Sequence, residues 1–137
     1  MMPNFATELP MFLLMGFFLL NLKHFLVDFP WQPPFMWMNK GTYGHMGGIS
    51  HALLHALGTF AVFMILFNSW DERAAFVSIY LAAIDAIVHY HIDWAKMNIN
   101  KKMGWGPTTH AEFWTLTGLD QFLHQATYIG LLALVIK

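Results

Sequence analysis

Long apolar runs alternate with short polar segments along the whole chain of 137 residues. Four of these runs approach the roughly 20 residues that an α-helix needs to cross a bilayer. They cover residues 9–29, 48–67, 74–96 and 112–136. Prolines follow the first run, and Gly47 precedes the second, where helices would break. The pattern predicts an all-α polytopic membrane protein, a four-transmembrane-helix bundle that forms one transmembrane domain over residues 1–137.

The composition strengthens the membrane prediction. The chain is 57% hydrophobic and 11% charged, with a mean hydropathy of +0.46. A soluble domain carries about 25% charged residues, so this chain has too few to cover a surface that faces water. We therefore expect the lipid bilayer as a partner. The net charge of −1 and the lack of a basic run argue against nucleic acid.

Lysine and arginine positions predict an orientation in a bacterial inner membrane. Segments around 30–47 and 97–110 carry Lys40, Lys96, Lys101 and Lys102, whereas the opposite side has Arg73 and Lys137. The positive-inside rule then predicts that the loops at 30–47 and 97–110 are cytoplasmic. Trp31, Trp37, Trp94, Trp105 and Trp114 fall near the same boundary, as in an interfacial belt.

Two further expectations concern the first apolar run. The stretch MMPNFATELP has no Lys or Arg and no small-residue cleavage site follows it, so we expect the run to stay in the mature protein. Near the end of the run, Lys23 is expected to extend toward the cytoplasmic interface with its charged head in the headgroup region.

Ionisable residues recur at four-residue spacing inside every apolar run. The pairs are His24 with Asp28, His51 with His55, His89 with Asp93, and Asp120 with His124. Asp85 lies one further turn from His89. Residues four apart share a helix face, and in an up-down bundle all four pairs fall in one leaflet. Four helices that each present such a pair can build one site in the bundle core.

Taken one at a time, these residues have a simpler interpretation than a shared site, because a single buried histidine is usually a hydrogen-bonded core residue. An ionisable residue in a membrane is costly, however, and usually has a partner or a function. The matched depth of five histidines and three aspartates favours one shared metal or proton site. Asp93 has a rival partner in Lys96, and the other histidines, His45, His91 and His110, lack such pairing.

The ligand types restrict the metal. The chain has no cysteine, so any ion would be bound by imidazole and carboxylate, a set that suits zinc or iron, or else manganese. Eight candidate ligands exceed one tetrahedral site, so one or two divalent ions are expected: His24, Asp28, His51, His55, His89, Asp93, Asp120 and His124. Asp85 is expected to hold the free ring N–H of a ligating histidine, and Asp85 or Asp93 to act as the general base.

The polar motifs also carry a resemblance. They are HFLVDFPWQ, Lys40, HALLH, HYHIDWAK and DQFLH, over residues 24–124. In this order they resemble a family of small integral membrane proteins of bacteria and their phages, known as a domain of unknown function. The resemblance implies a polytopic protein with a functional polar site. The pattern is more distantly similar to membrane-bound metal-dependent hydrolases, which implies hydrolysis.

These observations favour a metal-dependent hydrolase that acts on a lipid or lipid-linked substrate. Lys40 and Lys96 could attract an anionic headgroup, although a positive-inside role is the simpler expectation for each. Two alternatives stay open: a non-catalytic accessory subunit with partner subunits or as a homo-oligomer, where the metal is structural, and an ion or proton conduit. Di-iron redox chemistry would require more HxxxH and HxxHH motifs than the one at His51 and His55.

Overall fold

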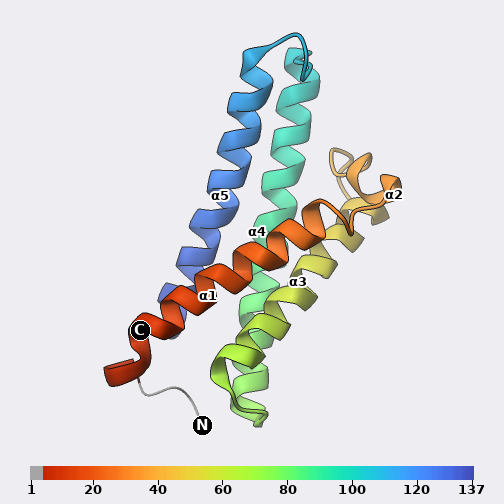
Figure 1. Cartoon of the computed structure of the whole chain (residues 1–137). Coiled ribbons are helices and arrows are strands. Elements are labelled where there is room, and N and C mark those ends of the chain that lie inside the picture. Colours follow the sequence, from red (N-terminus) through yellow and green to blue (C-terminus); the bar gives the residue numbers. More distant parts are fainter. Residues whose placement is uncertain (1–4) are drawn as a thin grey trace.

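The computed structural model describes residues 5–137, and α-helix is the regular secondary structure found there. Figure 1 shows the five helices: α1 (Phe5–Asp28), α2 (Pro34–Trp37), α3 (Met46–Phe67), α4 (Glu72–Met103) and α5 (Ala111–Val135). The all-α prediction is confirmed. The first four residues, part of the N-terminal stretch considered above, lie outside the described range.

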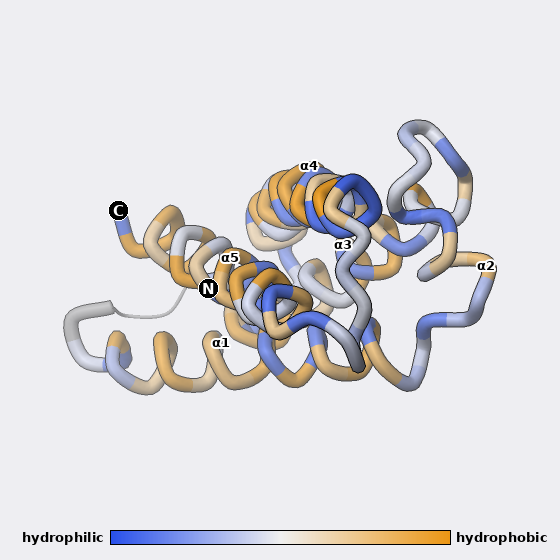
Figure 2. The backbone as a smooth tube through the Cα atoms, turned by 90° about the horizontal axis from the view of Figure 1, so that it is seen from above, coloured by the Kyte–Doolittle hydropathy of each residue, from blue (hydrophilic) through white to orange (hydrophobic). Residues whose placement is uncertain are grey.

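The four long helices form a ring around a common core. Helices α1 and α4 lie diagonally, and each packs against both α3 and α5. Helices α4 and α5 run side by side and antiparallel, whereas α1 crosses the bundle at a steep inclination (Figures 1 and 2). The connection between α4 and α5 projects beyond the other helices. This arrangement brings the C-terminal half of α1 and the N-terminal half of α3 to the middle of α4.

The helix ends follow from local chemistry. His45 precedes α3, and its Nδ1 accepts a hydrogen bond of 3.0 Å from Gly47 N. The Asp71 carboxylate caps α4 by accepting from Ala74 N at 2.8 Å. Gly104, with a φ of 68°, ends α4 in the left-handed conformation that glycine adopts without strain.

Two predicted boundaries differ from the structure. The third helix, expected to end at residue 96, continues to Met103, so the connection to α5 is residues 104–110 rather than 97–110. No helix breaker occurs before Gly104, and Lys101 and Lys102 in the last turn complement the helix dipole. The segment 30–47, expected to be a loop, contains the short helix α2, which begins at Pro34.

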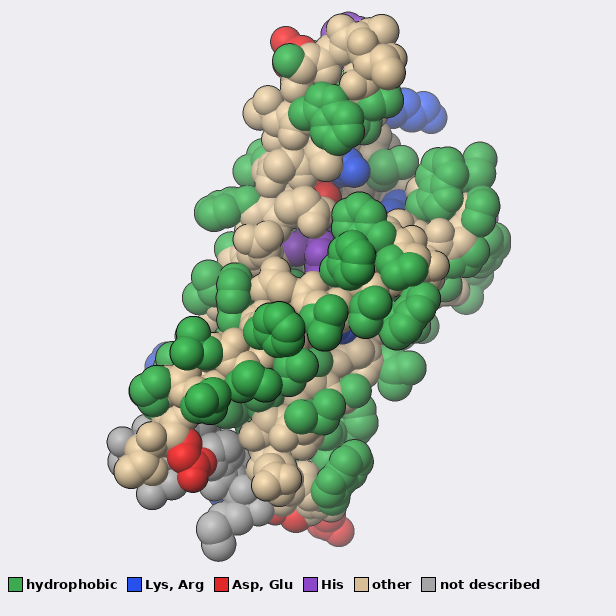
Figure 3. Space-filling model, in the orientation of Figure 1, with side chains coloured by type: hydrophobic (Ala, Val, Ile, Leu, Met, Phe, Trp, Pro, Cys, Tyr) green, Lys and Arg blue, Asp and Glu red, His purple; other side chains and the backbone are tan. Residues whose placement is uncertain are grey.

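Three helices are long and apolar enough to cross a membrane: Thr7–Asp28, Met46–Phe67 and Glu72–Met103. Helix α5 is 25 residues long but is not among them. Its first half contains Asp120, Gln121 and His124, which lower its hydropathy. Large apolar side chains such as Phe18, Phe76 and Phe122 are nonetheless exposed on the long helices. Figure 3 shows hydrophobic side chains over much of one face.

One half of the bundle has a largely hydrophobic centre, with the Tyr128 hydroxyl at its edge and the buried Ser78 hydroxyl on α4. It combines the N-terminal part of α1 with the C-terminal part of α3, the start of α4 and the end of α5. Its members are Phe12, Leu20, Val62, Phe63, Met64, Phe67, Ala74, Leu81, Tyr128, Leu131 and Leu132. The other half, toward α2 and the α4–α5 connection, holds the polar residues that the sequence paired.

Candidate metal centre

The four predicted pairs converge in a single cluster in the core. Three overlapping groups each offer ligand atoms within 4.8 Å of one another. They are Asp28 with His51, His55 and His89; His24 with His89 and His124; and Asp93 with Asp120 and His124. All five histidines are buried. In Figure 3, histidine side chains are visible at the bottom of a recess between α1 and α5.

The Asp28 carboxylate lies on one side of the cluster, surrounded by imidazoles. His24 Nε2 is 2.9 Å from its Oδ2, and His51 Nε2 is 2.9 Å from its Oδ1. His55 Nε2 lies 3.3 Å from the same Oδ1. One carboxylate at the end of α1 is therefore shared by its own helix and by the first turns of α3.

Asp93 occupies the opposite side. His89 Nε2 and His51 Nε2 each lie 3.3 Å from its Oδ2, and His124 Nε2 lies 3.5 Å from its Oδ1. His124 Nε2 is also 3.5 Å from Asp120 Oδ1, and the Nε2 atoms of His51 and His89 face each other at 3.2 Å. Ligands at roughly 2.0–2.2 Å from a tetrahedral ion are about 3.4 Å apart. The observed separations match that spacing.

The charges of the cluster are unbalanced. Asp28, Asp93 and Asp120 contribute three carboxylates, and Lys40 is the one lysine within ion-pair distance of them in the described chain. With neutral histidines, this leaves a formal charge of −2. Uncompensated charge in a low-dielectric interior is costly. One divalent cation would neutralise the group, so the residues present fit a metal ion.

Lys40 was expected to serve the positive-inside rule, and the structure shows that it also contacts the cluster. It is buried, and its Nζ lies 2.9 Å from Asp93 Oδ2 and 3.4 Å from Asp28 Oδ1. The backbone around it is tied to α4: Asn98 Nδ2 donates to Gly41 O at 2.9 Å. These contacts hold the ammonium over the cluster.

Two further hydrogen bonds hold the loop that carries Lys40 against α4, and one of them involves His91. Gly44 N donates to Tyr90 OH at 2.7 Å, and Tyr43 OH lies 3.1 Å from His91 Nε2. His45 caps α3, and His110 contacts the Thr109 hydroxyl at 2.7 Å. His45, His91 and His110 thus have local structural contacts outside the cluster.

The structure corrects the expectation for Lys23. It does not extend to the interface but is buried, and its Nζ donates to Asp85 Oδ2 at 2.8 Å. It also lies 3.2 Å from His55 Nδ1 and 3.2 Å from Tyr128 OH. Gly58 makes room for its stem, because a Cβ there would lie 2.5 Å from Lys23 Cγ.

The position of Asp85 differs from the expected contact with a ligating ring. Its Oδ2 accepts from Lys23 Nζ and from the Thr59 hydroxyl. His89 Nδ1, on one of the rings that Asp85 was expected to hold, has no hydrogen-bond partner among the described residues. Asp85 therefore reaches the cluster through Lys23 and His55 rather than directly.

The lysine determines the direction of the hydrogen bonds around it. An ammonium only donates, so His55 Nδ1 accepts and we assign its proton to Nε2, which faces Asp28. Tyr128 likewise accepts from Lys23, and its hydroxyl, 2.8 Å from His24 Nδ1, donates to that ring. His24 Nε2 then carries a proton toward Asp28. In this arrangement His24 and His55 hold the Asp28 carboxylate.

A polar pocket of about 170 Å³ opens onto the cluster. Its lining includes the carboxylates of Asp28, Asp93 and Asp120 together with Lys40 and Lys96. The volume admits several water molecules. The cluster is therefore buried but is connected to a cavity of mixed charge.

Some of the polar residues around the cluster that were not expected could have been found from the helical repeat. Thr59 and Tyr128 extend two of the pairs by one more turn, to His51–His55–Thr59 and Asp120–His124–Tyr128. Lys23 directly precedes His24. No comparable spacing identifies Lys40, because it lies on a loop.

Apolar helices around a buried histidine and aspartate cluster define this chain as a helical protein of membrane type with a candidate metal centre. The model of a family described as "Protein of unknown function (DUF3307)" matches residues 16–137, and the chain belongs to this family. The matched range contains every cluster residue as well as Lys23 and Lys40. No curated protein and no solved structure matches the chain.

Proposed function

We propose that this protein is a membrane-embedded metal-dependent hydrolase that acts on a lipid or lipid-linked substrate. The observation that carries the proposal is the surplus of carboxylate and imidazole atoms at ligand spacing, next to a polar pocket. A structural site would have no need of such a pocket. The apolar half of the bundle argues against a conduit, because beyond Lys23 and Asp85 its described core offers no carboxylate, imidazole or amine to carry an ion or proton onward.

The proposed ligands are the groups whose coordinating atoms are not engaged in the hydrogen bonds that Lys23 and Tyr128 make with His55 and His24. They are Asp28, His51, His89, Asp93, Asp120 and His124. His24 and His55, also candidates from the sequence, would orient Asp28. The formal charge of −2 supports one divalent ion, with zinc or iron preferred and manganese next. Such an ion supplies Lewis-acid polarisation of the scissile group and activation of water.

The remaining residues have separate proposed roles. Asp93 lines the pocket and would accept a proton from water there. Lys40, held 2.9 Å from Asp93, would bind an anionic group of the substrate. Asp85 lies outside the pocket and holds Lys23, so we assign it a positioning role rather than that of the base.

The proposed topology has four spans, with α5 as the fourth. Phe122, Ile129 and Leu134 are exposed along α5 and suit contact with lipid. The segments 30–47 and 104–110 would face the cytoplasm of a bacterial inner membrane. Since the chain has no cysteine, single cysteines at Tyr43 and Asp71 give clean labelling sites. Labelling of position 71 but not of position 43 from the cytoplasmic side would show that the orientation is the reverse of the one proposed.

The enzyme proposal is tested on protein purified in detergent and in nanodiscs. Elemental mass spectrometry is expected to find close to one zinc or iron per chain. Release of labelled headgroups or acyl chains from a bacterial lipid extract is expected to need that metal and to be lost in Asp93→Asn. Bound metal without turnover would support the accessory subunit instead, and absence of metal at any concentration would refute the centre.

A further inference from the structure

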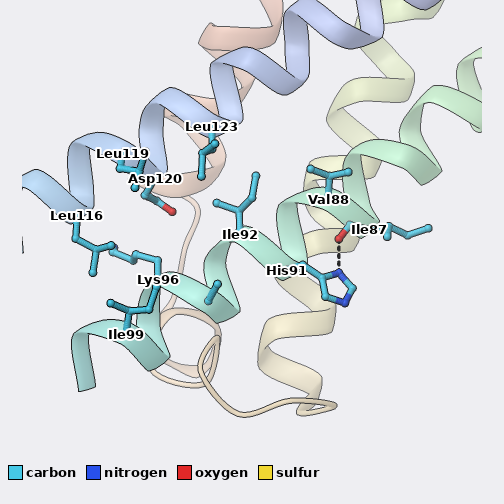
Figure 4. A pocket seen from close by; sticks show the side chains of 11 residues that line it. Ile87, Val88, His91, Ile92, Lys96, Ile99, Leu116, Leu119, Asp120 and Leu123 are labelled. Atoms are coloured by element: carbon cyan, nitrogen blue, oxygen red, sulfur yellow. Dashed lines mark hydrogen bonds between the residues drawn. The ribbon is translucent and has the colours of Figure 1, made fainter. Parts of the chain in front are cut away.

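A second cavity, larger and apolar, adjoins the metal centre. It has a volume of about 460 Å³ and lies between α4 and α5. Figure 4 shows its walls. The apolar side chains include Ile87, Ile92 and Ile99 of α4 and Leu116, Leu119 and Leu123 of α5. Helix α4 is a candidate membrane span, and α5 is the fourth span of the proposed topology, in which the groove faces the acyl chains of the bilayer.

The groove and the polar pocket share two charged residues. Lys96 and Asp120 line both cavities, and Figure 4 shows Asp120 among the groove residues. From Ile87 to Lys96 the helix rises about 14 Å. The groove is therefore apolar along most of its length and reaches the carboxylates of the centre near Lys96, about one helical turn before Ile99.

The geometry points to the α4–α5 groove as the binding site for one acyl chain of an anionic bilayer phospholipid. The chain lies along Ile87, Ile92 and Leu123, while the phosphate is held at Lys96, beside the polar pocket. This places the headgroup toward Lys40 and the metal centre. The assignment deepens the proposed function and rests on it for the fate of the headgroup and for the divalent ion that offsets the nearby carboxylates.

The charge distribution supports an anionic lipid rather than a neutral one. Lys96 is the cation at the junction of the two cavities, and Lys40 lines the polar pocket beyond it. The three carboxylates there would repel a phosphate, but the proposed divalent ion offsets them. A zwitterionic lipid such as phosphatidylcholine also carries a phosphate, but its choline group would bring another cation close to Lys96 and Lys40, whereas the headgroup of an anionic lipid adds none.

The test uses the full chain in nanodiscs that contain phosphatidylcholine and a photoreactive probe with a diazirine in the acyl chain. The probe is either phosphatidylglycerol or phosphatidylcholine, and labelled peptides are mapped by mass spectrometry. The phosphatidylglycerol probe is expected to label residues 87–99 and 116–123 well above residues 76–80, which also expose large apolar side chains. Ile92→Trp should block this labelling, whereas Ile129→Trp, on a different part of α5, should not.

Charge variants test the headgroup assignment. Lys96→Gln is expected to reduce the preference for phosphatidylglycerol about fivefold, the scale of one lysine near anionic lipid. Lys101→Gln, an exposed lysine outside both cavities, is the matched control. Equal labelling of all exposed helices, a preference that survives Lys96→Gln, or protein–protein cross-links through the groove in place of lipid labels would each overturn the assignment. Metal content is measured on the same samples, so that failure of the centre and failure of the groove are separate results.

Discussion

The two halves of the bundle use the same four helices but stabilise them differently. Toward the α3–α4 connection, the core consists of side chains such as Phe63, Phe67 and Leu81. Toward α2 and the α4–α5 connection, the core consists of histidines, carboxylates and two lysines. In lipid, apolar helix faces gain little from leaving their solvent, so packing and polar contacts decide how helices associate.

The contrast indicates what each half contributes. Apolar contacts do not depend on direction, and the apolar half tolerates changes that conserve volume. In the polar half every buried donor and acceptor needs a partner, and a surplus of negative charge is retained. Such an arrangement costs stability and is expected where a site binds a ligand. Lys23 and Asp85 lie where the two halves meet.

The largest expected effect is at this boundary. Lys23→Met would leave Asp85 buried and unpaired, and the expected loss is about 3–5 kcal/mol in the free energy of unfolding. Adding Asp85→Asn should recover most of it, because the unpaired charge is then removed. Unfolding in detergent, followed by circular dichroism, measures both variants. A loss that Asp85→Asn does not recover would contradict the pairing.

Phe63→Ala tests the apolar half on its own. Phe63 is fully buried, and the cavity would cost roughly 3 kcal/mol through lost packing. Metal affinity, measured by titration of the folded fraction, should stay within about twofold of the wild type, because effects at separated sites are close to additive. A parallel loss of metal binding would show that the halves are coupled.

His89→Gln tests the polar half. Removing a proposed ligand should weaken metal binding at least about 100-fold, above the 10–100-fold typical of residues that only support ligands. His91→Gln is the matched control, because His91 lies two residues on and contacts Tyr43 instead. Competition with a chelating dye measures the affinity. Equal effects of the two substitutions would refute the ligand assignment.

Gly58→Ala should have a smaller effect, which acts through both the packing at this position and the placement of Lys23. The added methyl group would push against the stem of Lys23, and overpacking of this kind costs about 1–3 kcal/mol. Gly118→Ala is the control, because no atom lies within 4 Å of a Cβ there. We expect it to be neutral or stabilising in thermal unfolding, since alanine favours helix. Comparable losses for both would mean that Gly58 has no special role.

The smallest effect is expected at the exposed start of α4. The hydrogen bond from Ala74 N lowers the pKa of Asp71 below its ordinary value of 3.8. A lowered pKa stabilises the folded state above pH 3.8, and this contribution is lost as the pH falls through the folded value. The wild type should therefore be more stable to unfolding than Asp71→Asn, by a small and constant margin between about pH 5 and pH 8. The two unfolding curves should converge in stronger acid.

Much of the helical framework could be predicted from the sequence alone. Apolar run lengths predicted four long helices, and their limits differ from the structure mainly at the end of α4. The spacing of His24 with Asp28, and of His51 with His55, correctly indicated that these side chains share helix faces. Such four-residue relations are local and depend only on the helical repeat.

Tertiary structure decided which atoms meet. Lys23 and Asp85 are 62 positions apart, and their contact depends on how α1 lies across α4. Lys40 reaches Asp93 because hydrogen bonds to α4 hold its loop, which helical periodicity does not describe. The tautomer of His55 follows in turn from Lys23. The sequence by itself determined the helices and the faces that carry ionisable groups, whereas packing between helices determined the partner of each group, because those contacts join residues distant in the chain.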